Sequence, residues 1–420
     1  MTGRRKGPRR EAPTTSGELG GPPAKAGVSE PPLYGVSMRR DLSAQSGDEP
    51  GRLRLGVIGC GVLSQVYLQN LVAAPGVEVV ACADPFAERA AARAAEFGIG
   101  RSCSPAELLA DPEVDMVVNL TVPSAHFEIT RTALRGGKHV WSEKPLAVDR
   151  EQGATLLREA ADRGLLLGCA PDTILGPGLQ TCRTLLDDGL IGAPMAASAF
   201  FFSRGPERWH PDPAFLYQAG AGPLWDVGIY YLTALVGLLG PVRRVSAFGR
   251  RLFPERVIGS GPRAGETFSV GTDTYVSCIL EFAGGALANL VASVGSWGPD
   301  LPKLQIYGPD GVLDGPDPNT FGGPIRANLH ADEGGWRDLL LPGDTVDSSP
   351  NQRGIGVLDM VAALAEGRPP RASGDLAYHV LDVLQSVSDS AANGRQIEVA
   401  STCERPQPLP AGSLPMRLRA

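Results

Sequence analysis

The first half of the chain alternates short apolar runs with amphipathic segments. Nearly continuous apolar runs are typical of strands buried on both faces of a parallel sheet; they occupy residues 53–58, 77–83, 114–122, 139–142 and 165–170. Apolar residues at helical spacing separate these runs, at 63–73, 86–97, 124–135 and 150–163. This alternation with short connections predicts a right-handed, doubly wound parallel sheet of the Rossmann type over residues 53–172.

The pattern changes after a helix predicted at 177–187. Strand-like runs now follow one another, at 196–202, 242–251, 269–282, 286–294, 304–307 and 325–330. Gly284-Gly285 and Pro309-Asp310-Gly311 fall where hairpin turns belong. One helix interrupts the strands, and two helices and a short strand end the pattern, at 225–239, 354–366, 378–392 and 396–399. We therefore expect an α/β protein whose second domain, residues 173–400, is α+β with a large, mostly antiparallel open sheet.

The two ends of the chain show no such periodicity. Residues 1–52 are rich in Arg, Gly, Pro and Ser, a composition that favours a disordered extension. Residues 401–420 are expected to form a loose C-terminal tail. The remaining length is sufficient for two domains with hydrophobic cores of their own.

Composition and charge exclude several classes of function. The net charge is −7 with no sustained basic stripe, so nucleic acid is not an expected partner. No apolar stretch reaches the roughly 18 residues of a membrane span. The seven cysteines are odd in number and scattered, and the five histidines lack paired ligand spacing, which argues against a disulfide framework and a metal site. We expect a cytoplasmic protein, because free thiols suit a reducing compartment.

A glycine-rich loop follows the first predicted strand. In Gly59-x-Gly61-x-x-Ser64, Gly59 permits a tight turn, Gly61 lets the backbone approach a pyrophosphate, and the following helix directs its amides at the phosphates. Asp84 ends the second strand, where a carboxylate hydrogen-bonds the adenosine ribose and favours NAD over NADP, although Arg89 could soften that preference. The candidate cofactor-binding residues are Gly59, Gly61, Val62, Leu63, Ser64, Asp84, Arg89, Asn119, Leu120, Thr121, Pro123, His126, Glu143 and Lys144.

Two of these positions have plain structural alternatives. Asn119-Leu120-Thr121 ends a strand and could line the nicotinamide ribose, or could simply form the turn into the next helix. His126 could reach the cofactor, but a surface or packing histidine is the commoner case.

Glu143-Lys144-Pro145 follows the fourth predicted strand. A lysine at the end of a buried parallel strand is costly unless it is paired. Burial and a nearby positive nicotinamide would lower the pKa of Lys144 toward a value useful for proton transfer, and Glu143 could orient a cofactor ribose. The alternative is a Glu–Lys ion pair at the rim of the sheet.

Further candidates lie in the second domain. Asp226 and Tyr230 are four residues apart on a predicted helix and so share a face, or they are a helix-start charge and a packing aromatic. Trp209-His210, on a Pro-rich loop, could stack on a sugar ring or could lack a special role. The candidate catalytic residues are Lys144, Tyr230 and Asp226; the candidate substrate-binding residues are Lys144, Asp172, Trp209, His210, Asp226 and Tyr230.

Together, the Gly-x-Gly loop, Glu143-Lys144-Pro145 and Asp226-x-Gly228-x-Tyr230 resemble the Gfo/Idh/MocA family of NAD(P)-dependent oxidoreductases over residues 53–400. The resemblance implies that Lys144 lies beside the nicotinamide and hydrogen-bonds the substrate hydroxyl. The family's second motif is usually Asp-x-Gly-x-His, with the histidine as acid/base. Tyr230 stands in that place here, as in a branch with Asp-x-Gly-x-Tyr.

The resemblance implies a dehydrogenase that transfers a hydride between a nicotinamide and a CH–OH group of a sugar, cyclitol or related polyol. Either Lys144 takes the alcohol proton, or Tyr230 takes it with a pKa lowered by Lys144; of the two we favour Lys144, with Asp226 positioning the substrate. Two other functions remain open: a glycosidase that uses bound NAD in a redox cycle, and a non-catalytic NAD(P)-binding sensor. Family members pair through the open sheet, so a homodimer or homotetramer is expected.

Overall fold

The computed structural model describes residues 52–218, 220–332, 335–339 and 351–410. The predicted N-terminal extension therefore lies outside the described residues, apart from Arg52, and so does the end of the predicted C-terminal tail, residues 411–420.

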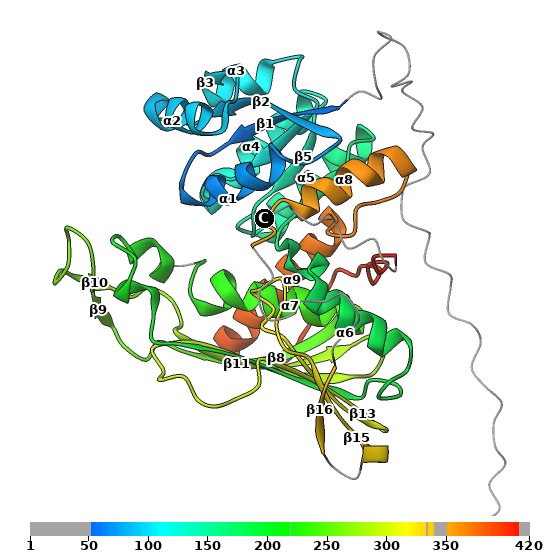
Figure 1. The fold of residues 1–420 in the computed structure, drawn as a ribbon. Coiled ribbons are helices and arrows are strands. Elements are labelled where there is room, and N and C mark those ends of the chain that lie inside the picture. Colours follow the sequence, from blue (N-terminus) through cyan, green and yellow to red (C-terminus); the bar gives the residue numbers. More distant parts are fainter. Residues whose placement is uncertain (1–51, 219, 333–334, 340–350, 411–420) are drawn as a thin grey trace, which may run out of the picture. The chain divides into compact units, whose positions relative to one another are not determined.

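A six-stranded sheet forms the first domain (Figure 1). Its strands lie in the order β3-β2-β1-β4-β5-β6. Every neighbouring pair is parallel. The strands are β1 (Leu53–Ile58), β2 (Val77–Ala83), β3 (Ser102–Cys103), β4 (Met116–Asn119), β5 (His139–Ser142) and β6 (Leu167–Cys169). The helices are α1 (Val62–Leu71), α2 (Ala87–Phe97), α3 (Pro105–Ala110), α4 (Pro123–Arg135) and α5 (Arg150–Asp162). From β1 the strands are added first toward β3 and then, starting with β4, on the other side of β1. Such sheets bind their ligands at this switch point between β1 and β4.

A nine-stranded sheet forms the second domain, in the order β16-β15-β14-β13-β7-β12-β11-β8-β17. Only β12 and β7 pair in parallel among these described strands; every other neighbouring pair is antiparallel. The strands are β7 (Ala196–Ser203), β8 (Val242–Arg250), β11 (Tyr275–Phe282), β12 (Leu287–Val294), β13 (Leu304–Gly308), β14 (Gly311–Gly315), β15 (Arg326–Leu329), β16 (Trp336–Asp338) and β17 (Ile397–Glu398). The predicted fold class is confirmed in both domains.

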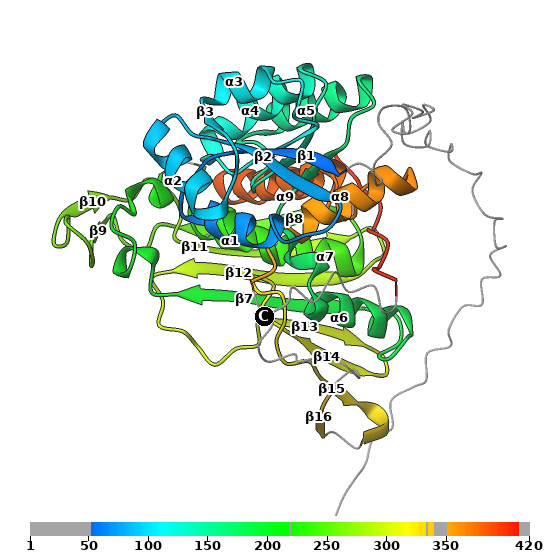
Figure 2. The same cartoon turned by 45° about the horizontal axis from the view of Figure 1, so that its top comes forward.

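Helices cover one face of this sheet, as Figure 2 shows for α6 (Pro177–Asp187), α7 (Ile229–Leu239) and α9 (Gly374–Asn393). Helix α7 is apolar over nearly its whole length, and its residues from Ile229 to Leu238 are buried. The other face carries apolar side chains that remain exposed in the single chain. Phe248 on β8 is 80% exposed, and Ile279 on β11 and Leu287 on β12 are half exposed.

Several short elements were not predicted. Strand β3 has two residues and β16 has three, too few for a period-2 pattern to show. Strand β17, by contrast, lies within the strand predicted at 396–399. The single strand expected at 269–282 is two strands, β10 (Thr267–Ser269) and β11, because Gly271 and Asp273 between them are poor strand formers. Strand β10 pairs instead with β9 (Glu255–Val257) in a separate two-stranded sheet. A wide helical turn, Leu224–Gly228, precedes α7.

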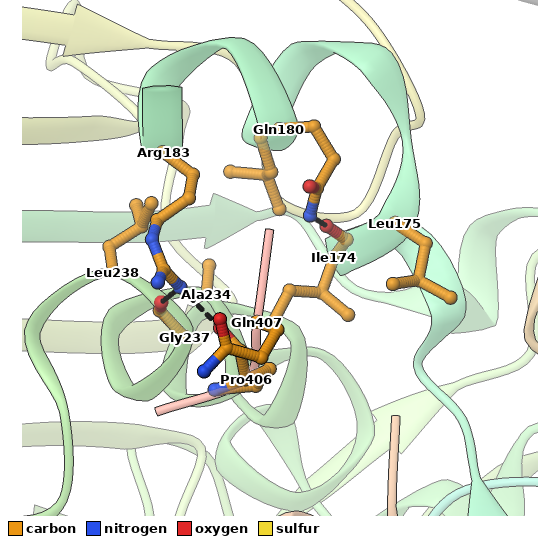
Figure 3. Close-up of a pocket in the computed structure, with 10 residues that line it drawn as sticks. Ile174, Leu175, Gln180, Arg183, Ala234, Gly237, Leu238, Pro406 and Gln407 are labelled. Atoms are coloured by element: carbon orange, nitrogen blue, oxygen red, sulfur yellow. Dashed lines mark hydrogen bonds between the residues drawn. The ribbon is translucent and has the colours of Figure 1, made fainter. Parts of the chain in front are cut away.

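The first ten residues of the predicted loose tail are held by hydrogen bonds although they form no helix or strand. Arg183 of α6 donates to the carbonyl of Pro406 (2.6 Å), and the Leu409 amide donates to Gln180 (2.8 Å). Arg371 donates to the carbonyl of Gln407. A small, mostly apolar pocket lies between this segment, α6 and α7 (Figure 3). Residues 401–410 therefore act as a strap across these helices.

Asp172 joins the end of the first sheet to helix α8 (Ile355–Glu366). It begins a short 3₁₀ turn after β6, and its carboxylate accepts hydrogen bonds from the amides of Gly354 (2.8 Å) and Gly356 (3.3 Å). These amides begin α8, so Asp172 supplies the cap that α8 lacks in its own sequence. Burial, with a smaller contribution from the Glu143 carboxylate, raises the pKa of Asp172 to about 6.

This raised pKa predicts a pH-dependent stability. Between about pH 4 and 6 the folded chain holds a proton on Asp172 that the unfolded chain has lost, so the stabilisation present at low pH disappears as the pH rises through 6. At about 1.4 kcal/mol for each pKa unit, the loss is about 3 kcal/mol. The free energy of unfolding of wild type, minus that of Asp172→Asn, should therefore fall by about this amount between pH 4 and 7 in urea titrations. Asp300→Asn on an exposed loop is the control, and a difference that does not vary with pH contradicts the assignment.

Candidate active site

The glycine loop between β1 and α1 leaves open the space that a pyrophosphate needs. Gly59 has a φ of 102°, and a Cβ there would lie 2.6 Å from the Leu120 carbonyl group, so only glycine fits. A Cβ on Gly61 would meet none of the described atoms within 4 Å. Among the described residues no side chain caps the N-terminus of α1, which Gly61 begins, and Val62 is 90% exposed. The first amides of α1 are thus available to an anion.

Ser64 stabilises this loop through a buried hydroxyl group. Its hydroxyl is buried and donates to the carbonyl of Gly61 (2.7 Å), and it accepts a hydrogen bond from Arg93 Nε (3.1 Å). Arg93, which was not predicted, also reaches the Gly61 carbonyl with Nη2 (3.3 Å). Leu63 is half buried against the core.

Asp84 lies directly after β2 and beside the glycine loop. One carboxylate oxygen accepts from the amide of Cys60 (2.8 Å) and the other from the amide of Phe86 (3.0 Å). A carboxylate offers about four acceptor positions, so Asp84 can hold the loop and still accept from a ribose hydroxyl. Arg89 stacks over the exposed Phe86 ring, with 4.4 Å between the guanidinium carbon and the ring centroid.

The turn after β4 is held to the turn after β5 by buried polar groups. Asn119 accepts from the Thr121 hydroxyl (2.6 Å) and donates to Thr130 (3.1 Å). The two ring nitrogens of His126 lie 2.7 Å from the carbonyl oxygen of Pro145 and 2.9 Å from that of Thr121. Burial lowers the pKa of His126. Asn119 and His126 are thus framework residues, while Thr121 and Pro123 remain at the surface of the turn.

Lys144 crosses from the first domain to the second. Its ammonium group donates to both the backbone carbonyl (2.7 Å) and the carboxylate (2.9 Å) of Asp226, and its side chain is 15% exposed. Burial alone would lower the pKa of Lys144, but the attraction of Asp226 outweighs it and holds that pKa well above its usual range. The expectation of a lowered pKa for Lys144 is therefore wrong, because it did not include Asp226 as a direct partner.

Glu143 connects this lysine to the helix of the glycine loop. One carboxylate oxygen accepts from the hydroxyl of Tyr67 on α1 (2.8 Å), and the other accepts from the amide of Lys144 (3.1 Å). Trp141 in turn donates to the Tyr67 oxygen (3.3 Å). Tyr67 was not predicted, since its helical spacing marks it only as a core residue.

Tyr230 lies on the same side of the helix as Asp226, as the spacing predicted. Its ring centroid is 5.3 Å from Lys144 Nζ, and its hydroxyl oxygen accepts a hydrogen bond from Arg353 Nη2 (3.3 Å). Burial raises the pKa of Tyr230, whereas the positive charges of Lys144 and Arg353 act to lower it. Arg353 is a site residue that was not predicted: it lies 123 residues after Tyr230, and no local motif marks it.

The structure does not bring together all of the predicted substrate residues. Trp209 and His210 contact each other (5.6 Å between ring centroids), His210 contacts Phe215 (5.5 Å), and Trp209 is 69% exposed. In the described part of the chain, no hydrogen bond, ion pair or ring contact joins either residue to Lys144, Asp226 or Tyr230. Asp172 accepts from the amide of Gly354, the residue that follows Arg353, and lies near enough to Glu143 and Arg353 for their charges to act on its pKa.

The described residues contain no group of three or more His, Cys, Asp or Glu side chains that could hold a metal ion. None of their helices is both long enough and apolar enough to cross a membrane.

Sequence comparisons match both domains. Residues 53–170 match the model of an oxidoreductase family with an NAD-binding Rossmann fold, and residues 179–314 match the GFO/IDH/MocA C-terminal domain. A dTDP-3,4-didehydro-2,6-dideoxy-alpha-D-glucose 3-reductase from Streptomyces violaceoruber is 32% identical over 62% of this chain and 79% of its own length. A 1,5-anhydro-D-fructose reductase from Ensifer adhaerens is 34% identical over 42% of this chain; the match spans 54% of that protein, about half its length. A scyllo-inositol 2-dehydrogenase (NAD(+)) from Bacillus subtilis is 29% identical over 62% of this chain and 73% of its own length.

Solved structures show the same fold. Levoglucosan dehydrogenase in complex with NADH and levoglucosan superposes with a TM-score of 0.73 at 23% identity, over 84% of this chain and all of that one. An NAD binding oxidoreductase from Klebsiella pneumoniae gives 0.72 at 23% identity, over 83% and 99% of the two chains.

The features around the glycine loop form a cradle that fits the NAD that such folds bind. It consists of the open face of Gly61, the uncapped start of α1 and the Asp84 carboxylate. Both domain models match in order along the chain, and one relative is 32% identical over 79% of its length. The chain belongs to the Gfo/Idh/MocA family of oxidoreductases with an NAD-binding Rossmann fold.

Proposed function

We propose that this protein transfers a hydride between NAD and a hydroxyl-bearing carbon of a sugar, cyclitol or related polyol. The observation that carries the proposal is the Lys144–Asp226 ion pair beside the Tyr230 phenol. Lys144 follows β5, at the carboxyl edge of the sheet where the glycine loop follows β1. The named substrates of relatives, an anhydrofructose and an inositol among them, support a polyol.

The charges around the site favour a neutral substrate. The ammonium of Lys144 and the guanidinium of Arg353 face the carboxyl groups of Asp226, Glu143 and Asp172. The cations are thus already compensated by acidic groups, and a substrate anion would add a further negative charge to a partly buried site. A hydroxylated, uncharged ring meets no such penalty.

Lys144 acts in this proposal as a cationic hydrogen-bond donor. An ammonium group has three hydrogens, and two of them are directed at Asp226. The third is left for the substrate oxygen, whose developing negative charge a protonated lysine stabilises during oxidation. NAD supplies the hydride acceptor in that direction of the reaction.

Tyr230 is the better candidate for the proton acceptor. The raised pKa of Lys144 makes a neutral lysine base costly. Burial raises the pKa of Tyr230 as well, but Lys144 over its ring and Arg353, bonded to its oxygen, both act to lower that pKa. A base with cationic neighbours can act nearer neutral pH. We therefore assign the proton transfer to Tyr230, with Asp226 positioning Lys144.

Asp84 supports a preference for NAD over NADP, because a carboxylate directly after β2 and beside the glycine loop would repel a 2′-phosphate. A cytoplasmic location is part of the same proposal. It is supported by the seven cysteines, all of which are free thiols, as in a reducing compartment.

We also propose that the protein is a homodimer or homotetramer. The helix-free face of the nine-stranded sheet exposes Phe248, Ile279 and Leu287 on three adjacent strands. An exposed apolar surface of this kind usually marks a contact with another protein surface. A second copy of the same face would cover it with two-fold symmetry.

Replacing Gly61 by Ala tests the cofactor site without disturbing the fold. The new methyl group has room in the protein itself but would enter the space of the pyrophosphate. We expect an unchanged melting temperature without nucleotide and the loss of the rise that NAD produces in wild type. Gly100→Ala, another glycine with open space around its Cβ, should keep that rise. A full NAD-dependent rise in Gly61→Ala would place the cofactor elsewhere.

Lys144→Met and Tyr230→Phe test the chemistry. Removing the donor or the acid/base should lower kcat for NADH formation on a polyol panel by about a hundredfold or more, with NAD binding retained in the thermal shift. Tyr231→Phe is the matched control, since the Tyr231 hydroxyl bonds Asp317 instead (3.0 Å). A loss of only a few-fold in Tyr230→Phe would exclude tyrosine as the base, and full turnover by Lys144→Met would sink the site assignment.

Light scattering tests the assembly. Wild type should have the mass of two or four chains, and Phe248→Asp should shift it toward one chain, because a charge would be buried in an apolar contact. Phe215→Asp, an equivalent change at a half-exposed phenylalanine in the short helical turn Ala214–Tyr217, should leave the mass unchanged. A monomeric wild type refutes this part of the proposal.

A further inference from the structure

We propose that Arg353 is a positioning residue for the acid/base: it holds the phenol oxygen of Tyr230 in place and stabilises the phenolate. This inference rests on the proposed function, because it gives Tyr230 the proton transfer. The observation behind it is the hydrogen bond from Arg353 Nη2 to the Tyr230 oxygen, which connects the start of α8 with the start of α7.

The backbone of Arg353 is fixed from several directions. Asn70 on α1 donates its side-chain amide to the carbonyls of Asn351 (2.9 Å) and Arg353 (2.8 Å). Asp172 accepts from the amide of Gly354, the next residue (2.8 Å). Two buried polar side chains, Asn70 and Asp172, thus hold a segment that has no helix or strand structure of its own. A guanidinium held in this way loses little further freedom when it bonds Tyr230.

A second hydrogen bond fixes the orientation of the guanidinium group. Nη1 donates to the Asn351 side chain (3.0 Å) while Nη2 donates to Tyr230. The planar fork therefore faces the phenol in one orientation, which a lysine ammonium could not reproduce. Since the Tyr230 oxygen already accepts this bond, its remaining positions are left for exchange of a proton with the substrate.

The charged groups that face Tyr230 are Lys144, Arg353 and Glu143. Asp172 faces Arg353 from the end of β6, and Glu143 also faces it. Lys144 is occupied by Asp226, so its charge is largely compensated. Arg353 is the cation that touches the phenol oxygen, and it therefore stabilises the phenolate more directly than Lys144 does.

The reaction step balances as follows. During oxidation the Tyr230 phenolate would take the proton from the substrate O–H group, and the electron pair of that O–H bond would form the new C=O bond. The hydride released from the C–H bond would be accepted by NAD, held by the glycine loop and Asp84. The Arg353 hydrogen bond is kept throughout and is strongest before the proton arrives, when the oxygen is negative. Arg353 thus favours the ionisation that makes Tyr230 a base, and it forms no bond with the substrate.

Arg353→Gln, with Arg353→Lys beside it, tests the proposal in the full-length enzyme. We expect Arg353→Gln to lower kcat about tenfold to a hundredfold, the range for a lost hydrogen bond to a charged group. The limb of the kcat/KM profile that reports the base should move up by about one pH unit, and Arg353→Lys should reverse most of this pH shift but less of the loss in kcat. Arg326→Gln, which removes a positive charge from the distant strand β15, should change neither.

Double variants separate a positioning role from a merely structural one. In the Tyr230→Phe background, Arg353→Gln should cost little more, because the group through which it acts is gone. Methylguanidine added to Arg353→Ala should restore part of the turnover, and none in Arg353→Ala/Tyr230→Phe. Additive losses, or an unmoved pH profile in Arg353→Gln, would overturn the proposal.

A titration that needs no turnover distinguishes this failure from failure of the proposed function. The tyrosinate absorbance of each protein is measured as a function of pH. Subtracting the curve of Tyr230→Phe from that of wild type, and the curve of Arg353→Gln/Tyr230→Phe from that of Arg353→Gln, gives the titration of Tyr230 with and without Arg353. The midpoint should be about one pH unit higher without Arg353. Equal midpoints overturn the proposal, whether or not any polyol is turned over. If the midpoint shifts but no polyol is turned over, the proposed function is overturned, while the assignment of Arg353 as the positioning residue of Tyr230 stands.

Discussion

The ion pair between Lys144 and Asp226 is the constraint on which the site depends. A lysine that is mostly buried at the end of a parallel strand must find a partner, and its partner lies in the other domain, on the helical turn before α7. The pair therefore fixes the end of β5 against the substrate domain. It also fixes the protonation state of the lysine, whose pKa is raised by Asp226 despite burial. The position of Tyr230 follows, because it lies one turn after Asp226.

The polar groups behind this pair serve mainly to hold turns in place. Asn119 and His126 join the turns after β4 and β5, Glu143 joins the latter turn to α1, and Asp172 joins the end of β6 to α8. Each of these groups is buried and bonded to backbone or to another buried side chain, so each fixes a segment that carries no regular structure. Residues that the motifs assign to the cofactor thus also fix the turns that carry them.

Local patterns predicted the parts of this structure that depend on neighbouring residues. Strands 53–58 and 77–83 match β1 and β2 to the residue, because both are apolar runs bounded by turns, and the motifs that follow them fall at the expected edge of the sheet. The lowered pKa expected for Lys144 was wrong because Asp226, 82 residues away, is its partner. Arg353 and Tyr67 were not predicted for a similar reason. Arg353 precedes a helix in a segment without a pattern, and Tyr67 lies at a helix position that the apolar spacing assigns to the core.

In the proposed mechanism, Tyr230 takes the place that the family resemblance gives to a histidine, and this changes what the surrounding charges must do. A histidine titrates near neutral pH without help, whereas tyrosine starts near pKa 10, and burial raises the pKa of Tyr230 further. An acid/base of this kind can work near neutrality only if cations lie close to its oxygen. Arg353, before the start of α8, donates a hydrogen bond to that oxygen, and Lys144, after the end of β5, lies over the phenol ring, 5.3 Å from its centroid. The exchange of one side chain is thus matched by charges that reach the site from two distant parts of the chain.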